Sequence, residues 1–183
     1  MFPRSGLVSV LLMVLQWSGP GLASPLRPIC DPRVLDRFIK EARDVESAVR
    51  SCKEGCGMVE SLTVPLTSVD FSLWEKTEVG ERSREVQAGL WLLAQALRRA
   101  RASLSDAALC GLIDTCISNI HSIGQVIRSL SMEQNIPPPT ATGASGTQTW
   151  QVTSLAELFR IHTNFLRGKV RLLLSDAPAC QSS

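Results

Sequence analysis

The feature that most constrains the fold is the unequal spacing of four amphipathic helical segments. Their apolar residues recur at helical spacing over residues 31–51, 78–104, 105–130 and 154–177. Only a few residues join the second segment to the third, which makes these two segments antiparallel neighbours. The other two links, from about residue 51 to 77 and from about 131 to 153, are long enough to cross the whole bundle. The sequence therefore predicts an all-α four-helix bundle with up-up-down-down topology.

Local signals support the ends of these segments. Asp31-Pro32 supplies a cap acid and a proline at the first helical position. Ser154 and Glu157 form a capping box for the fourth segment. Within the two crossovers, residues 62–64 and 149–152 are rich in β-branched and aromatic side chains, which predicts a short strand pair between the crossovers.

The first 23 residues have the layout of a secretory signal peptide. Arg4 precedes an apolar stretch over residues 7–15, and the small-residue pattern Gly21-Leu22-Ala23 follows. Cleavage after Ala23 removes one of the 19 Lys and Arg residues and none of the 17 acids, which leaves a net charge of +1 on residues 24–183. We expect a single secreted domain over 24–183. Its near-neutral charge argues against nucleic-acid binding, and its polar end argues against a membrane or lipid anchor.

Six cysteines lie after the signal peptide: Cys30, Cys52, Cys56, Cys110, Cys116 and Cys180. Secretion places them in an oxidising compartment, and they allow many pairings. The short polar loop between Cys52 and Cys56 can bring these two within bridging distance, and Cys30 and Cys180 stand at opposite ends of the chain. A metal site is not expected, because no second Cys or His pair has zinc-ligand spacing.

No enzyme chemistry is predicted. His121 and His162 are interpreted as partly exposed helical histidines that share no cleft, and we find no nucleophile, phosphate-loop or metalloprotease motif. We therefore expect no cofactor. Saposin-like carriers of lipid or small ligands remain an alternative, since they also join helices by disulfides. The remaining feature is one exposed stripe on the fourth segment, suited to binding a protein: Arg160, Asn164, Arg167 and Arg171.

Several motifs then resemble a known family. They are Ile29-Cys30-Asp31-Pro32-Arg33-Val34-Leu35, Val64-Pro65, Phe71, Trp74, Glu78-Val79-Gly80 and, most specifically, Asn164-Phe165-Leu166-Arg167-Gly168-Lys169. Together they resemble the erythropoietin/thrombopoietin family of four-helix class I cytokines. The resemblance implies a monomeric hormone that dimerises a single-pass class I receptor, the erythropoietin receptor, and stimulates red-cell production. Two receptor copies would bring their associated cytoplasmic kinases together.

The resemblance also implies two receptor-binding surfaces. The strong surface maps onto Arg43, Thr67, Ser68, Phe71, Asn164, Arg167 and Gly168. The weak surface maps onto Val34, Arg37, Phe38, Ser118, His121, Ser122, Ile123, Val126 and Arg128. The implied disulfides join Cys30 to Cys180 and Cys52 to Cys56, which agrees with the spacing.

The sequence departs from the family at several positions. Ser68 replaces a lysine of the strong surface, and His121 replaces an arginine of the weak surface. Asn-linked glycosylation sites are absent, while residues 140–149 have a composition suited to O-linked sugar. Cys110 and Cys116 are additional, and we expect Cys116 to be a buried thiol on the apolar stripe of its helix.

Overall fold

The computed structural model describes residues 30–58, 60–133, 148–177 and 180. Its long helices are α2 (Pro32–Ser51), α4 (Val79–Ala102), α5 (Ala107–Glu133) and a fourth helix made of α6 (Leu155–Phe165), η2 (Leu166–Val170) and α7 (Arg171–Asp176). The crossovers carry β1 (Leu62–Pro65), α3 (Phe71–Lys76) and β2 (Thr149–Val152). The predicted signal peptide and nearly all of the predicted O-glycan segment lie outside the described residues.

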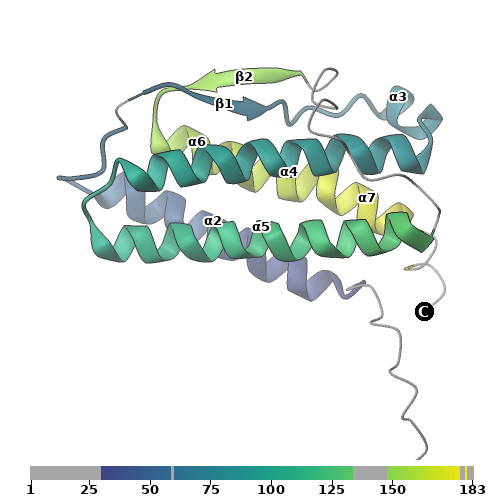
Figure 1. Cartoon of the computed structure of the whole chain (residues 1–183), viewed down its shortest axis with the longest axis horizontal. Helices are drawn as coiled ribbons and strands as arrows, with labels where there is room; N and C mark the ends of the chain where they lie inside the picture. Colours follow the sequence, from purple (N-terminus) through teal and green to yellow (C-terminus); the bar gives the residue numbers. More distant parts are fainter. Residues whose placement is uncertain (1–29, 59, 134–147, 178–179, 181–183) are drawn as a thin grey trace, which may run out of the picture.

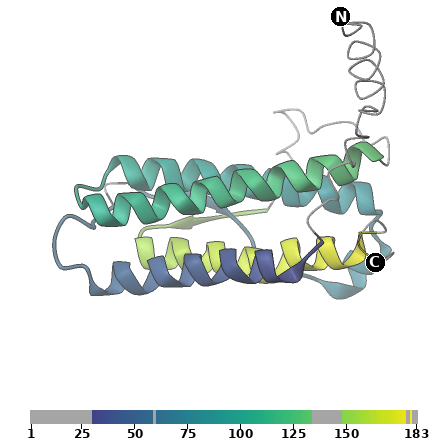
Figure 2. The same cartoon turned by 90° about the horizontal axis from the view of Figure 1, so that it is seen from below.

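The helices are arranged as an up-up-down-down bundle. In Figure 1, α2 and α4 run in one direction, while α5 and the fourth helix run in the other. Figure 2 shows α2 beside the fourth helix and α4 beside α5. This arrangement confirms the topology predicted from the two long links and the short one.

The helix starts follow from the capping residues. Asp31 accepts a hydrogen bond from the Arg33 amide at 2.9 Å, and Ser154 accepts one from the Glu157 amide at 3.2 Å. Asp106 caps α5 in the same way, accepting from Leu109 at 2.7 Å. Each cap satisfies an amide that has no partner within its helix, and such a cap typically contributes about 1 kcal/mol.

The predicted strand pair is present. β1 and β2 are antiparallel, with Leu62 opposite Val152 and Val64 opposite Trp150. Leu62, Val64 and Val152 point inward and are buried, whereas Trp150 is exposed. The sheet therefore joins the two crossovers and covers one side of α4 (Figure 1).

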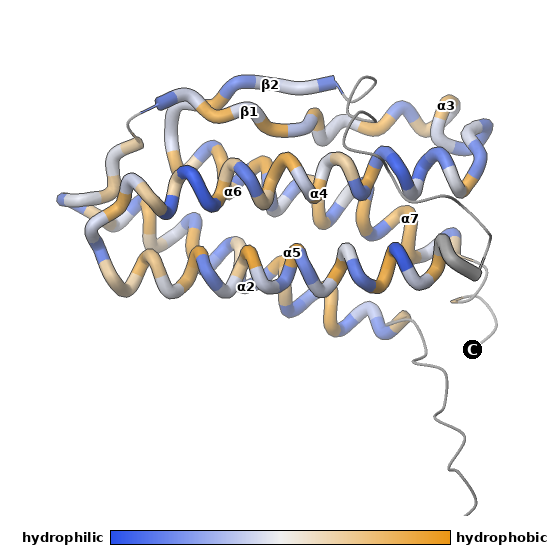
Figure 3. The backbone as a smooth tube through the Cα atoms, in the orientation of Figure 1, coloured by the Kyte–Doolittle hydropathy of each residue, from blue (hydrophilic) through white to orange (hydrophobic). Residues whose placement is uncertain are grey.

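The core lies between the four helices and under β1. Apolar residues recur along each helix in Figure 3. The largest fully buried apolar side chains are Phe159, Phe165, Leu62, Leu93, Leu97, Ile113, Ile127, Leu158 and Leu166. Gly89 makes room for one of them, because a Cβ at this position would lie only 2.3 Å from the ring of Phe165. Gly89 thus lets the fourth helix approach α4 closely.

Two expectations about the fourth helix need correction. The helix is not a continuous α-helix, because η2 is a π-helical segment in which the Arg171 amide bonds to the Leu166 carbonyl five residues earlier. In addition, His162 is not partly exposed: only 1% of its surface is accessible. Its position falls on the face of α6 that packs into the bundle, where the apolar pattern did not predict a polar ring.

The cysteines pair as the family resemblance implies. Disulfides join Cys30 to Cys180 and Cys52 to Cys56. Cys110 and Cys116 are free thiols, and Cys116 is buried as expected. Burial raises the pKa of Cys116 to about 12, so this thiol stays protonated and unreactive at neutral pH.

Candidate functional site

The first candidate surface is a shallow hollow between α2 and the fourth helix. It has a volume of about 430 Å³ and is lined by Asp36, Ile39, Lys40, Arg43, Arg167 and Arg171. The structure thus brings together Arg43 and Arg167, which are 124 positions apart in the sequence. We call this the basic hollow.

The cations of the basic hollow differ in their partners. Arg171 forms an ion pair with Asp36, and Lys40 pairs with Asp44 at 2.8 Å. In the described part of the chain, neither Arg43 nor Arg167 has a hydrogen-bond or ion-pair partner. Their guanidinium groups therefore keep all their donors available for a carboxylate of another molecule.

The first crossover lies directly beside the basic hollow. A Cβ built on Gly168 would lie 3.7 Å from the Thr67 carbonyl oxygen, an ordinary van der Waals distance, so η2 and the first crossover lie next to each other here. Ser68 is exposed and lines a second, polar hollow of about 390 Å³. Phe71 on α3 is 62% exposed, and Asn164 is exposed one turn before Arg167.

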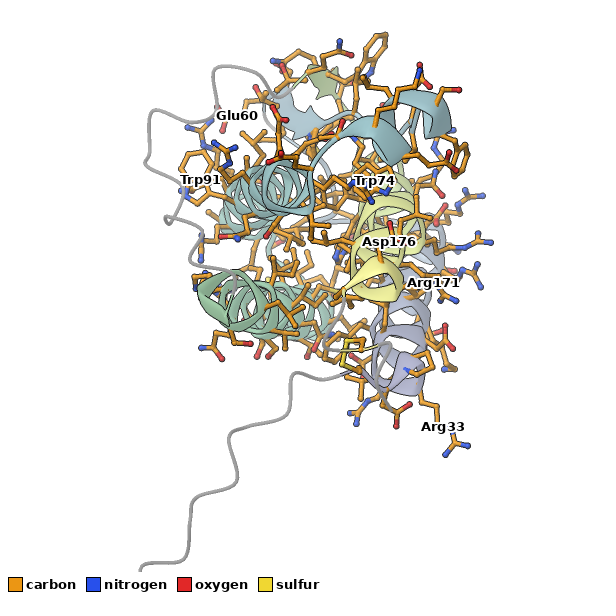
Figure 4. All side chains as sticks on the ribbon, turned by 90° about the vertical axis from the view of Figure 1, so that its right-hand side faces the viewer. Arg33, Glu60, Trp74, Trp91, Arg171 and Asp176 are labelled. Carbon is orange, nitrogen blue, oxygen red and sulfur yellow. A yellow bond between two sulfur atoms is a disulfide. The ribbon has the colours of Figure 1, made fainter. Side chains whose placement is uncertain are left out.

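A polar cluster ties α3 to two long helices. Trp74 Nε1 and Arg82 Nη1 both donate to Asp176 Oδ2, at 3.1 and 2.8 Å. The Arg82 guanidinium also lies 5.5 Å from the Trp74 ring centroid and donates to the Thr77 carbonyl at 2.7 Å. Figure 4 shows Trp74 and Asp176 on the same side of the bundle. This cluster, which the sequence patterns did not indicate, fixes the segment that presents Phe71.

A second cross-link holds η2 against α4. Lys169 is buried, and its Nζ donates to Glu85 Oε1 at 2.6 Å. The motif that carried the family resemblance therefore contains residues with opposite orientations: Arg167 faces solvent, whereas Lys169 faces α4. Residues two positions apart lie roughly 200° apart around a helix, which places these two side chains on opposite sides.

The second candidate surface lies on the other side of α2, against α5. Val34, Phe38, Ser122 and Val126 line a narrow apolar hollow with a volume of about 20 Å³. Ile123 also borders it but is only 4% exposed, so it supports the surface from below. We call this the apolar hollow. Its volume is far below the roughly 300–1,000 Å³ of a small-ligand pocket.

Arg37 and Glu41 lie near Phe38 on α2, outside the lining of the apolar hollow, and have partners within the protein. Arg37 Nε donates to Glu41 Oε1 at 2.8 Å, and Asn119 Nδ2 donates to Glu41 Oε2 at 2.6 Å. The bond from Arg37 is the largest cause that holds the pKa of Glu41 below its usual value, against an opposing effect of burial. Arg37 remains mostly exposed, and its Nε bonds to Glu41, so a binding partner would share the charge of Arg37 with Glu41.

The remaining predicted residues lie along the outer side of α5. Ser118, His121 and Arg128 are exposed there. His121 Nε2 lies 2.5 Å from Arg98 Nη2 of α4. The side chain of Arg128 runs back along its helix toward Gly124: a Cβ built on Gly124 would lie 3.5 Å from Arg128 Nη1.

Among the described residues, no cluster of three or more His, Cys, Asp or Glu side chains is placed to hold a metal. The two histidines do not open onto a common cleft, because His162 is buried and His121 is exposed. A helix with the length and apolarity needed to span a bilayer is not found in the described part of the chain.

Comparison with known proteins gives a consistent result. The sequence profile of the erythropoietin/thrombopoietin family matches residues 27–183. The chain is 56% identical to erythropoietin of Epinephelus coioides over 96% of its own length and 94% of that relative. The chain belongs to the erythropoietin/thrombopoietin family. Erythropoietin of Danio rerio is 52% identical over 99% of this chain and 98% of the length of that relative. Erythropoietin of Oryctolagus cuniculus is 38% identical over 93% of this chain and 91% of the length of that relative.

Membership of the erythropoietin/thrombopoietin family confirms the prediction of a cytokine hormone built as a four-helix bundle with disulfides. The family is one of hormones rather than an enzyme class, and it implies a cytokine receptor as the partner.

Proposed function

We propose that residues 24–183 form a secreted hormone, released by removal of the signal peptide 1–23, that binds two copies of the erythropoietin receptor and stimulates red-cell production. The basic hollow, with Thr67, Ser68, Phe71, Asn164 and Gly168 around it, is the strong surface. The apolar hollow, with Arg37, Ser118, His121 and Arg128, is the weak surface. Because α2 contributes to both hollows on different sides, one hormone can engage two receptors at once.

The observation that carries this proposal is the pair of unpaired guanidinium groups, Arg43 and Arg167, facing one hollow. Four cations but only one acid line this hollow, so the positive charge favours an acidic partner. The charge in the hollow would speed the first encounter at low salt. The second receptor would then bind at the high local concentration that a shared membrane provides, so that a small apolar surface suffices for it.

The test is a titration of the purified hormone with the soluble receptor ectodomain, with complex mass measured by light scattering. We expect a complex with two ectodomains per hormone at high receptor concentration. Arg167→Glu should shift formation of both complexes to receptor concentrations roughly thirtyfold higher or more, whereas Val126→Glu should leave a complex with one ectodomain. Gln125→Glu, an exposed neighbour of Val126 outside the hollow, is the matched control. A wild-type hormone that binds only one ectodomain at saturation would disprove the two-surface proposal.

A further inference from the structure

The outer face along which α4 packs against α5 carries a second line of exposed cationic and aromatic side chains, and we call it the α4–α5 face. Arg98 of α4 contacts His121 of α5, and Arg101 of α4 pairs with Asp114 of α5 at 2.7 Å. These two contacts fix how the antiparallel helices are aligned. They also show that the α4 side of α5 is a different edge from the one that faces the apolar hollow.

This alignment of α4 with α5 places two more residues on the α4–α5 face. Trp91 lies seven residues before Arg98, and Arg128 lies seven residues after His121. Seven residues are two helical turns, about 10 Å, and return to nearly the same side of a helix. Because the helices are antiparallel, Trp91 of α4 and Arg128 of α5 lie at the same level along the bundle axis on the α4–α5 face. Trp91 is 56% exposed and points outward from α4 (Figure 4).

The chemistry of the Arg98 contact assigns a role to each partner. A guanidinium group has no hydrogen-bond acceptor, so the His121 nitrogen facing it must accept. In this contact Arg98 Nη2 is therefore the donor and His121 Nε2 the acceptor. In the described part of the chain Arg98 has no acidic partner, so its charge and remaining donors stay available.

We propose that Arg98 binds an acidic side chain of the second receptor, with His121 as its positioning residue and Trp91 as a neighbouring apolar contact. This inference rests on the proposed function, and it extends the weak surface from α2 and α5 onto α4. The α4–α5 face adjoins that surface, because His121 and Arg128 belong to both. Its charges favour an acidic partner: among the described residues neither Arg98 nor Arg128 has an acidic partner, whereas Asp114 is already paired with Arg101.

Tryptophan and arginine are both among the residue types most enriched at binding hot spots, and here both are exposed on rigid helices. Trp91 supplies a large apolar surface that loses little side-chain entropy on binding. Arg98 supplies a planar charged group that sheds water more readily than an ammonium group. The α4–α5 face is therefore suited to binding a protein segment that has an acidic residue near an apolar one.

The decisive measurement is the affinity of the second ectodomain for a preformed complex of hormone and one ectodomain. We expect Arg98→Glu to weaken this step at least tenfold and Trp91→Gln to weaken it at least fivefold, with first-ectodomain affinity within twofold of wild type. Arg99→Glu is the matched control, since Arg99 is also exposed but points about 100° away from Arg98 around the helix.

A double-mutant cycle tests the positioning role of His121. Because His121→Gln keeps an acceptor, second-step affinity should stay within threefold of wild type, whereas His121→Leu should lower it more. In an Arg98→Gln background, His121→Leu should have no further effect, because the group that it positions is gone. Additive effects would assign His121 a separate contact and overturn the positioning role.

Two failures can be told apart. If the wild-type hormone never binds a second ectodomain, the proposed function fails and this inference fails with it. If the wild type binds two ectodomains but Arg98→Glu behaves like Arg99→Glu, the two-surface function stands and the inference about α4 is wrong. Helical circular dichroism and melting curves of each variant exclude a change in folding.

Discussion

The two surfaces of α2 differ in how their arginines are held. Arg43 faces the basic hollow and has no partner in the described chain, whereas Arg37, nearly two turns earlier, is paired with Glu41 at 2.8 Å. When a guanidinium without a protein partner binds a receptor carboxylate, it gives up only its hydrogen bonds to water. A guanidinium that is already paired gains less from a new carboxylate, because its charge is partly offset by the acid that it holds.

This difference suggests a division of binding free energy between the proposed surfaces. The basic hollow combines unpaired cations with a contact region extended by Thr67 and Phe71. The apolar hollow offers a small patch of surface with its nearest charges already satisfied. We therefore expect the first to dominate affinity and the second to depend on receptors being held at one membrane.

The largest expected effect comes from reversing the charge at the centre of the basic hollow. Arg167→Glu should weaken first-receptor binding by about 2 kcal/mol or more, roughly thirtyfold, because it removes a free guanidinium and adds an acid facing an acidic partner. The melting temperature should barely change, since the side chain is exposed. Surface plasmon resonance with immobilised ectodomain measures the affinity.

Arg160→Glu is the matched control for Arg167→Glu. Arg160 is exposed on the same helix but pairs with Glu157 at 3.4 Å and does not line the hollow. Its reversal should change first-receptor affinity less than threefold. If the two reversals had equal effects, net charge rather than the basic hollow would control binding.

A second contrast lies beneath the surfaces, in their buried polar groups. Asn119 of α5 donates to Glu41 at 2.6 Å, whereas neither ring nitrogen of the buried His162 of α6 has a hydrogen-bond partner among the described residues. Desolvation lowers the pKa of His162 to about 4. The unfolded chain binds a proton at this ring near pH 6.5, but the folded chain does so only near pH 4.

The stability contributed by a neutral His162 is thus complete above about pH 6.5 and is lost as the pH falls toward 4. We expect the free energy of unfolding to drop by about 2 kcal/mol between pH 7.5 and pH 5. Urea denaturation across this range measures the slope. His162→Leu should flatten it while keeping or raising stability at pH 7.5, because an unpartnered polar ring is replaced by an apolar group. An unchanged slope in that variant would assign the pH dependence to other groups.

The sequence predicted those features that depend on local pattern. Caps such as Asp31 and Ser154 act within three residues, and apolar periodicity placed all four helices. The π-helical segment was missed because one extra residue in a turn leaves no trace in composition. The contacts of Arg98, Asp176 and Lys169 were missed because each depends on how two helices are aligned, which periodicity along one helix does not specify.

A smaller effect is expected from the cluster that fixes α3. Asp176→Ala leaves Trp74 Nε1 and Arg82 Nη1 without their acceptor, and the Arg82 side chain is only 11% exposed. Because water can reach the carboxylate site, we expect a loss of about 1 kcal/mol in stability, at the lower end for an unsatisfied buried donor. First-receptor affinity should fall by less than tenfold as α3 loosens.

Asp114→Ala is the matched comparison for Asp176→Ala. It also removes a carboxylate from an arginine, but Arg101 is 46% exposed and can be rehydrated. The melting temperature of Asp114→Ala should fall by less than half as much as that of Asp176→Ala. The first-receptor affinity of Asp114→Ala should not change. Equal melting losses would mean that the α3 cluster is no stronger than a surface ion pair.

The smallest expected effects test the contrast on α2 directly, with the same substitution at both arginines. Arg43→Ala should reduce first-receptor affinity by about fivefold, or 1 kcal/mol, because an unpaired cation of the basic hollow is lost. Arg37→Ala should reduce second-receptor affinity by less than twofold, because its guanidinium already bonds to Glu41 and gains little from a new acceptor. Both variants should keep the stability of wild type within about 0.5 kcal/mol, since exposed i,i+4 pairs contribute no more than this. If Arg37→Ala proved the more damaging of the two, prior pairing would not limit an arginine's contribution, and the division of binding free energy between the surfaces would have to be reversed.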